Sequence, residues 1–216
     1  CYMDYIGTNL CPDSLRLISA AKGKLVEQLI DPLDRELFAD PLGIGGFLLT
    51  KDRYLVLIKR SGKVSEACGR IDFPGGHPEP SAAGAETFED IFDISPEAAS
   101  HELFHSFCQE IADEVNIPLE SLAPPRLLGF IRNPGAAGRV SLLFLTHTSH
   151  TASEARHLYR QGPPEKYEST HLVTWRLADV LPVLSRIRAG AIGFEEGTGS
   201  SPPGDGVSGE KGKGTG

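Results

Sequence analysis

The sequence contains no long apolar run and few basic residues, and each absence excludes a class of protein. No segment approaches the roughly eighteen consecutive apolar residues that a membrane-spanning helix needs. The 21 Lys and Arg residues are outnumbered by 29 Asp and Glu, which gives a net charge of -8, and they form no basic cluster. A groove for a nucleic-acid backbone needs such a cluster. We therefore expect neither a membrane nor a nucleic acid as a partner.

The cysteines are few, and no two of them form a C-x-x-C pair. They are Cys1, Cys11, Cys68 and Cys108, dispersed along the chain. Dispersed cysteines are typical of reduced thiols in an intracellular protein, so we expect a cytoplasmic or nuclear location. A chain of 216 residues with 40% hydrophobic content has enough apolar surface for one ordinary core. One main domain is therefore expected.

The composition divides the chain into three parts. Residues 1–40 are expected to be the remnant of an N-terminal region, because residue 1 is Cys rather than Met. Residues 41–190 contain the regularly patterned apolar segments and are expected to form the main domain. Residues 191–216 are dominated by Gly, Ser, Pro, Glu and Lys. Such a segment buries too little apolar surface to order itself, so a disordered tail is expected.

Within the main domain, apolar segments of strand length alternate with segments of helical spacing. Turn residues separate them, as at Lys51-Asp52-Arg53. Strands interleaved with helices predict an α/β fold in which a mixed sheet is covered on both faces. The expected strands are 46–50, 54–59, 70–73, 127–131, 140–147 and 171–176; the expected helices are 25–37, 153–160 and 177–188; residues 135–138 are expected to form a turn, and residues 79–100 a surface loop with a helical turn.

A further helix carries three acids on one face. Glu110, Asp113 and Glu114 are three and four residues apart, so they are neighbours on a helix surface. Three such carboxylates repel one another unless a cation lies between them. We expect the helix to be short and to end at Asn116, which tolerates the left-handed conformation, with Pro118 blocking continuation. The opposite face is an apolar stripe expected to pack on the sheet: Phe104, Phe107, Cys108, Ile111 and Val115.

The acidic helix comes after a Pro74-Gly75-Gly76 turn, and the two together resemble the motif of the Nudix family, Gly-x5-Glu-x7-Arg-Glu-U-x-Glu-Glu-x-Gly-U, where U is a bulky aliphatic residue. Members of that family cleave nucleoside diphosphates linked to another moiety. Gly76 resembles the first Gly, and residues 109–117 resemble the second half, with an insertion of about twenty residues between them. The copy departs from the motif at four positions: Gln109 replaces Arg, Asp113 replaces Glu, Asn116 replaces Gly, and His101 stands at the position of the first Glu.

Shorter motifs extend the resemblance over residues 2–178. They lie at residues 2–9, 72–80, 101–104, 162–163 and 168–170. The resemblance implies the Nudix α/β/α sandwich with a mixed sheet. It also implies hydrolysis of UDP-glucose or UDP-galactose to UMP and a sugar 1-phosphate, with a small-molecule nucleotide-sugar as substrate. Neither the preferred sugar nor the oligomeric state follows from the pattern.

The acids suggest a magnesium site. Mg²⁺ is a hard ion that prefers carboxylate oxygens, and Glu110 and Glu114 are expected to hold it between the protein and the diphosphate, with Asp113 as a further ligand. The ion would neutralise the phosphates and help form an attacking hydroxide. The catalytic candidates are Glu110, Glu114 and Glu168, the last of which lies in a loop.

Three more residues are candidates for binding the substrate. The guanidinium of Arg60, at a strand end, fits a phosphate with two donors. Asp72 would accept hydrogen bonds from sugar or ribose hydroxyls. Tyr2 would stack on uracil through its aromatic face. Loops at strand ends often carry such sites, although ordinary surface charge and a loose chain end explain the same residues.

Two other functions stay open. Gln109 and His101 depart from the family motif in a way that fits a module which binds a nucleotide-sugar or a protein partner without turnover. Residues 101–105 also spell the H-E-x-x-H of zinc proteases. The downstream His or Gly of the extended protease patterns is missing. We therefore favour helix entry and core packing as the role of this segment.

Overall fold

The computed structural model describes residues 2–9, 11–25, 38–62, 68–87, 89–133 and 138–188. The chain divides into two units, Cys1–Leu177 and Ala178–Gly216, and each is described by itself. The domain boundaries expected at residues 40 and 190 stay predictions. The expected helix over 25–37, the turn over 135–138 and the tail over 191–216 lie largely or wholly outside the described residues.

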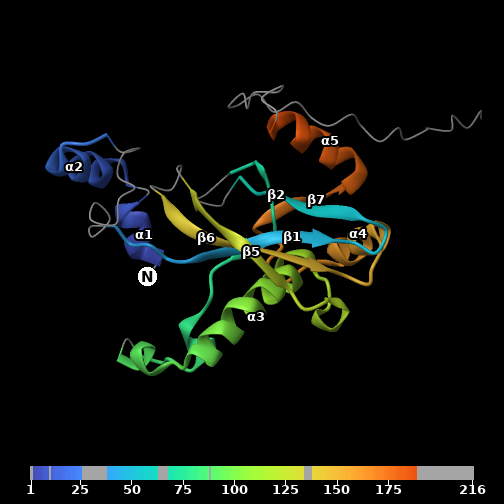
Figure 1. Ribbon diagram of the computed structural model, residues 1–216, viewed down its shortest axis with the longest axis horizontal. Coiled ribbons are helices and arrows are strands. Elements are labelled where there is room, and N and C mark those ends of the chain that lie inside the picture. The colour runs from blue at the N-terminus through green and yellow to red at the C-terminus, as the bar shows by residue number, and fades with distance from the viewer. Residues whose placement is uncertain are drawn as a thin grey trace, which may run out of the picture. The chain divides into compact units, whose positions relative to one another are not determined.

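A mixed sheet forms the centre of the first unit (Figure 1). The strand order is β3-β2-β1-β6-β5, with β4 paired to β1 and β7 paired to β2. β1 and β6 run parallel, and the other described pairs are antiparallel. The predicted α/β fold with a mixed sheet is confirmed. The strands are β1 Gly43–Leu49, β2 Tyr54–Arg60, β3 Ile71–Asp72, β4 Gly75–Gly76, β5 Arg126–Asn133, β6 Arg139–His147 and β7 Ser169–Arg176.

The predicted turn between β1 and β2 also positions a helix. Thr50 Oγ1 donates to Asp52 Oδ1 over 2.6 Å, and the chain reverses through Arg53 at a φ of 65°. The same Asp52 oxygen accepts the backbone N–H of Ala152 over 2.9 Å. Ala152 is the first residue of α4 (Ala152–Gln161), so a single carboxylate joins the hairpin turn to the start of that helix.

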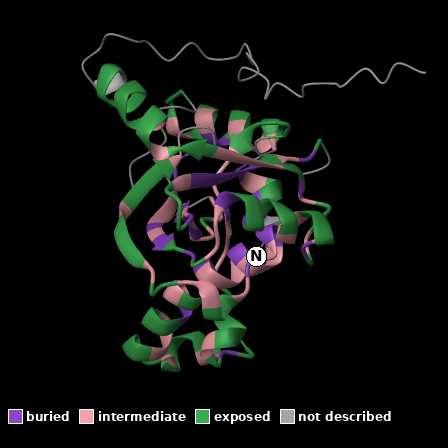
Figure 2. Ribbon diagram, turned by 90° about the vertical axis from the view of Figure 1, so that its right-hand side faces the viewer, coloured by how far each residue is buried: buried purple, intermediate pink, exposed green. Residues whose placement is uncertain are grey.

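The core lies between the sheet and α3. Residues 55–58 of β2 are all buried, which means that both faces of this strand are covered. On one face, Phe107 and Ile111 of α3 pack with Phe144 of β6, and the rings of Phe107 and Phe144 stack with centroids 5.3 Å apart. Figure 2 shows buried segments gathered in the interior and exposed segments on the outer surfaces. The predicted apolar stripe is confirmed for Phe107, Ile111 and Val115, which are buried, and for Phe104, which is half-buried and packs against them, whereas Cys108 is half-buried and lies outside this cluster.

Helix α3 is longer than the sequence analysis predicts. It runs from Pro96 to Val115 over 20 residues, so the expectation of a short helix is wrong. The reason is a strong start signal inside the expected loop: Ser95 Oγ accepts the N–H of Ala98 over 3.1 Å, and Pro96 occupies the first turn. The rest of that loop forms two short 3₁₀ helices, η3 (Pro80–Ala83) and η4 (Glu89–Asp93).

Two helices near the start of the chain were not predicted. They are α1 (Tyr2–Thr8) and α2 (Pro12–Lys22). The start of α2 has a sequence signal, since Pro12 and Asp13 suit a first turn, and Gly23 ends it at a φ of 61°. Tyr5 is fully buried, and the guanidinium carbon of Arg139 lies 5.0 Å from its ring centroid. This contact joins α1 to β6 within the first unit.

The remaining helices agree with their predicted ranges. α4 spans Ala152–Gln161 against a predicted 153–160, and α5 spans Leu177–Arg188 as predicted. Because α5 belongs almost wholly to the second unit, the expectation of a helix on the second face of the sheet stays a prediction. No helix in the described ranges is both long enough and apolar enough to cross a bilayer. A short 3₁₀ turn, η5 (Leu119–Ser121), follows α3.

Asn116 ends α3 as predicted, and its side chain adds a contact that spacing does not reveal. Its φ is 65°, and its Nδ2 donates to the carbonyl of Leu158 in α4 over 2.8 Å. We expect Asn116→Ala to lower the free energy of unfolding by about 2 kcal/mol, because it combines a strained backbone with a lost hydrogen bond. Asn116→Gly should cost about half as much, since Gly accepts this conformation. Urea unfolding of both variants measures the difference, and equal stabilities would contradict this account.

Candidate metal site on the acidic face of α3

Helix α3 packs against β4 and η3, the segment of chain that begins in the Pro-Gly-Gly turn. Glu114 is 1% exposed, and its Oε2 accepts the N–H of Gly75 over 2.8 Å. Its other oxygen, Oε1, is buried and has no hydrogen-bond partner among the described residues. One turn earlier, the carboxylate of Glu110 accepts a hydrogen bond from the backbone of His77. The two acids therefore lie one helical turn apart beside β4, and one oxygen of Glu114 has no hydrogen bond among the described residues.

Burial and like charge both act on this pair. Burial raises the pKa of Glu114 to about 9, and the charges of Glu110 and Glu168 add to it, while the Gly75 N–H and Arg60 oppose the rise. Burial likewise raises the pKa of Glu110 to about 7, with a further contribution from the charge of Glu165. A nearby cation stabilises the ionised form of such carboxylates, which burial disfavours.

A loop between α4 and β7 brings two more acids to the same place. Glu165 N–H donates to the carbonyl of Asp113 over 2.9 Å, and Ser61 N–H donates to the carbonyl of Glu168 over 2.7 Å. These bonds attach the loop to the end of α3 and to the end of β2. The predicted candidate Glu168 thus lies within electrostatic reach of both Glu110 and Glu114.

Glu165 is a site residue that the sequence analysis missed. Burial raises its pKa, and the charges of Glu168 and Asp113 add to the rise. One feature of the sequence could have indicated Glu165: it lies three residues before Glu168, in a turn that begins with two prolines. That signal was weak, because nothing local indicates that the turn folds back onto a helix about fifty residues earlier.

The carboxylate of Asp113 is hydrogen-bonded to a side chain of its own helix. Gln109, which stands where the Nudix motif has Arg, donates from Nε2 to Asp113 Oδ2 over 2.9 Å. Both residues line a pocket of about 300 Å³ beside the acidic face. The lining also includes His77, Glu79, Glu110 and Glu165. The role of Asp113 as a metal ligand stays a prediction.

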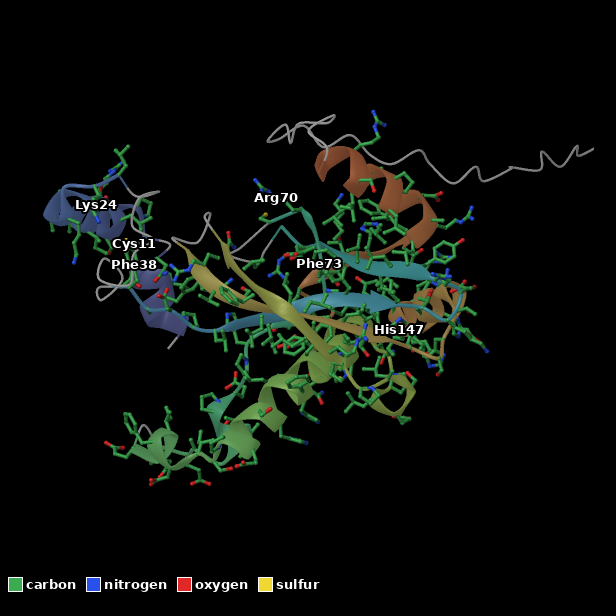
Figure 3. All side chains as sticks on the ribbon, viewed as in Figure 1. Cys11, Lys24, Phe38, Arg70, Phe73 and His147 are labelled. Atoms are coloured by element: carbon green, nitrogen blue, oxygen red, sulfur yellow. The ribbon has the colours of Figure 1, made fainter. Side chains whose placement is uncertain are left out.

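The three predicted substrate-binding residues have different positions. Arg60 ends β2, and its charge is felt by Glu114. Asp72 lies in β3, where its Oδ1 accepts the N–H of Phe73 over 2.9 Å. Phe73, labelled in Figure 3, directly precedes the Pro-Gly-Gly turn and packs against Phe47 of β1, with ring centroids 4.6 Å apart. Tyr2 lies in α1, but its side chain is outside the described part of the structure.

The residues of the H-E-x-x-H segment differ in burial and in contacts. His101 and His105 are exposed, and their rings stack with centroids 5.7 Å apart. Glu102 is buried, and its carboxylate accepts hydrogen bonds from the backbone of Glu79 and the hydroxyl of Ser106. The favoured interpretation, packing in the core, therefore holds for Glu102 and is wrong for the two histidines.

The chemistry of the acidic face fits a divalent cation. Glu110, Glu114, Glu165 and Glu168 supply hard carboxylate oxygens, which Mg²⁺ prefers, and the unpartnered Oε1 of Glu114 is directed to no described protein group. Among the described side chains, no three His, Cys, Asp or Glu already converge as a ligand set. A bound ion would therefore have to draw the acids together.

Comparison with known proteins tests the predicted resemblance. No family model matches the chain. The Bos taurus protein named uridine diphosphate glucose pyrophosphatase NUDT22 is 42% identical over 173 residues, which are 80% of this chain and 57% of that protein. Nudix hydrolase 9 of Arabidopsis thaliana is 29% identical over 191 residues, or 86% of this chain and 58% of its own length.

The predicted resemblance to the Nudix family is confirmed over 80% or more of the chain. It spans little more than half the length of the two curated relatives. A solved Nudix hydrolase from Alicyclobacillus acidocaldarius is 15% identical with a TM-score of 0.45, covering 71% of this chain and 85% of that one. A likeness at that level says nothing further about this chain.

Proposed function

We propose that this chain is a Nudix-type hydrolase that cleaves the diphosphate of a UDP-sugar with the help of Mg²⁺. The observation that carries the proposal is the buried Glu114, whose free oxygen lies beside Glu110 on a face also reached by Glu165 and Glu168. The relatives named as UDP-glucose pyrophosphatases support the substrate class, with UDP-glucose or UDP-galactose yielding UMP and a sugar 1-phosphate. The substrate is thus a small molecule.

The position of each residue suggests its role in binding the metal. Glu110 and Glu114 would hold Mg²⁺, with Glu165, Glu168 and Asp113 as the nearest further oxygen donors. The ion, when bound, supplies charge neutralisation at the diphosphate and lowers the pKa of water. Substrate binding and proton transfer would come from the side chains around the metal position.

Arg60 and Glu168 both lie at the end of β2. Arg60 lies within electrostatic reach of Glu114, so its guanidinium would hold phosphate oxygens next to the acids. The backbone carbonyl of Glu168 accepts the Ser61 N–H, which holds this part of the loop at the site, and the carboxylate of Glu168 would take the proton of the attacking water. Asp72, at the lip of the turn, would accept a sugar or ribose hydroxyl, and Tyr2 would stack on the uracil.

Removing the metal provides the direct test. Wild-type protein with Mg²⁺ should release UMP from UDP-glucose, and a chelator should abolish the release. Glu110→Gln should lower turnover at least about 100-fold, because one ligand charge is lost where the diphosphate must be neutralised. Glu120→Gln, in the exposed turn η5, is the matched control and should behave as wild type. Chelator-resistant release, or equal rates in the two variants, would remove the proposed site. Measuring UDP-galactose alongside distinguishes the preferred sugar.

A second candidate is a binding module without turnover. The bond from Gln109 to Asp113 favours it, because it engages a candidate ligand at the position where the Nudix motif places Arg. Calorimetry separates the two functions. Tight binding of UDP-glucose with no UMP after long incubation supports the module, whereas product formation supports the enzyme.

We also propose a cytoplasmic or nuclear location. The described cysteines, Cys11, Cys68 and Cys108, are free thiols, which is typical of a reducing compartment. Cell fractionation tests this, and recovery of the protein from the secretory pathway would contradict it.

A further inference from the structure

Three carboxylates of α3 accept backbone N–H groups from alternate residues of the segment 75–79, which leads from β4 to η3. We call these three hydrogen bonds the carboxylate ladder, and each of them a rung. They join Glu114 to Gly75 over 2.8 Å, Glu110 to His77, and Glu102 to Glu79 over 3.0 Å. Two of the three rungs involve the proposed metal ligands, and the third does not.

The spacing of the two backbones explains the first two rungs. Alternate N–H groups of an extended segment point the same way and are about 6.6 Å apart. Residues four apart on a helix are about 6 Å apart along its axis and lie in one row on its surface. The step from Glu114 to Glu110 therefore matches the step from Gly75 to His77. Pro78 then keeps His77 extended, because the residue before a proline avoids the helical region.

The third rung needs a different solution. The next position in the helical row is residue 106, where serine is too short to reach the backbone of Glu79. Glu102, one turn further along, reaches that N–H instead, and Ser106 donates its hydroxyl to the same carboxylate oxygen. Glu102 and Ser106 are each only 7% exposed, so this rung is shielded from water. Hydrogen bonds to a buried carboxylate are strong and directional.

We infer that Glu102 is a positioning residue for the site, acting through the segment 75–79 on Glu110 and Glu114. This inference rests on the proposed function. Glu102 ties the far end of the segment to α3, and the segment then holds Gly75 and His77 against the two ligands. The spacing between the ligands, and with it the affinity for Mg²⁺, then depends on a residue that is not one of the proposed ligands, although it lines the same pocket as Glu110 and Asp113.

The experiment compares four variants of the full chain. Glu102→Leu removes the rung by replacing the carboxylate with an apolar side chain of similar size, and it should weaken Mg²⁺ binding about tenfold by calorimetry. Glu102→Gln should restore most of the affinity, because its amide oxygen still accepts both donors. Glu97→Gln, on an exposed turn of the same helix, controls for the loss of one negative charge. Ser106→Ala removes only the support of the rung and should weaken binding less than Glu102→Leu does.

A second readout does not depend on the metal. In metal-free protein, Glu102→Leu should speed amide hydrogen exchange at His77 and Gly75 as well as at Glu79, whereas a purely local role would affect Glu79 alone. Wild-type affinity and unchanged exchange at His77 and Gly75 in Glu102→Leu would overturn the inference. If that variant does not fold, the same criteria apply to Ser106→Ala. If wild-type protein binds no Mg²⁺, the proposed function fails. Hydrogen exchange at the amides of Gly75 and His77 then decides whether Glu102 positions the segment 75–79.

Discussion

Replacing Glu114 with Gln is expected to stabilise the metal-free protein at pH 8 while removing tight Mg²⁺ binding. The carboxyl is buried, has an unpartnered Oε1 and lies beside Glu110, so ionising it in the fold is costly. Gln keeps the size of the side chain and an oxygen that accepts the Gly75 N–H, but carries no charge. Turnover of UDP-glucose should fall at least about 100-fold, since a ligand charge is missing. Stability and function thus change in opposite directions at one residue.

The sign of the pH dependence follows from the raised pKa. Burial raises the pKa of Glu114 to about 9, so in the fold the carboxyl retains its proton at a pH where the unfolded chain has lost it. The stabilisation is complete below the unfolded pKa and is lost as the pH rises toward the folded value. Wild-type protein without metal should therefore lose on the order of 3 kcal/mol of unfolding free energy between pH 5 and pH 8. Glu110, with its pKa at about 7, adds to the loss in the lower part of that range.

Urea unfolding at pH 5 and pH 8 measures this difference. Glu114→Gln should show a much smaller loss, and Glu97→Gln, which changes an exposed acid of the same helix, should show the wild-type loss. Saturating Mg²⁺ should raise the stability of wild-type protein at pH 8 and leave Glu114→Gln unchanged, because only a bound ligand stabilises the fold. Equal wild-type stabilities at the two pH values, or a variant that still gains from Mg²⁺, would refute the description of the site.

Changing the two neighbouring glycines of the turn to Ala is expected to have different effects, on stability at Gly75 and on Mg²⁺ binding at Gly76. At Gly75, a Cβ would lie 2.3 Å from the carbonyl oxygen of Ile44 and 2.6 Å from Cα of Gly45. These are backbone atoms of β1 that cannot move without breaking the pairing of β1 with β4. Gly75→Ala should therefore lower the free energy of unfolding by about 3 kcal/mol.

At Gly76, the obstacle is a side chain. A Cβ there would lie 2.0 Å from Oε1 of Glu110, which can rotate away. Gly76→Ala should cost less than about 1 kcal/mol of stability, yet it should weaken Mg²⁺ binding about tenfold or more by displacing Glu110. Unfolding curves and Mg²⁺ titrations of both variants provide the comparison, with Gly7→Ala in α1 as a control, since a Cβ at Gly7 meets open space and its φ lies outside the left-handed region. Similar profiles for Gly75→Ala and Gly76→Ala would contradict this assignment.

Several parts of the site follow from residue spacing because the interactions behind them are local. The acidic face, the apolar stripe ending at Val115 and the exit at Asn116 depend on helix geometry, which repeats identically wherever a helix forms. The same holds for the hairpin of β1 and β2 around its turn. The start of α3 at Pro96 was also readable from Ser95 and Pro96, but the composition of the surrounding segment concealed it.

Other parts depend on contacts between distant residues. Glu165 reaches α3 only because the loop before β7 folds back onto Asp113, and Glu102 takes its role from a backbone N–H 23 residues earlier. No pattern within either segment indicates the other. Long-range contacts of this kind are set by the packing of whole elements, so a single sequence does not reveal them.

The order of residues alone determined which side chains share the acidic face, which strands alternate with helices and which family motif the chain carries. Tertiary structure alone decided that Glu114 is buried, that its pKa rises to about 9, and that a hydrogen bond spanning 39 residues joins it to Gly75. The reason is physical: periodicity is a property of neighbouring residues, whereas desolvation and electrostatic energy depend on everything that packs around a charge.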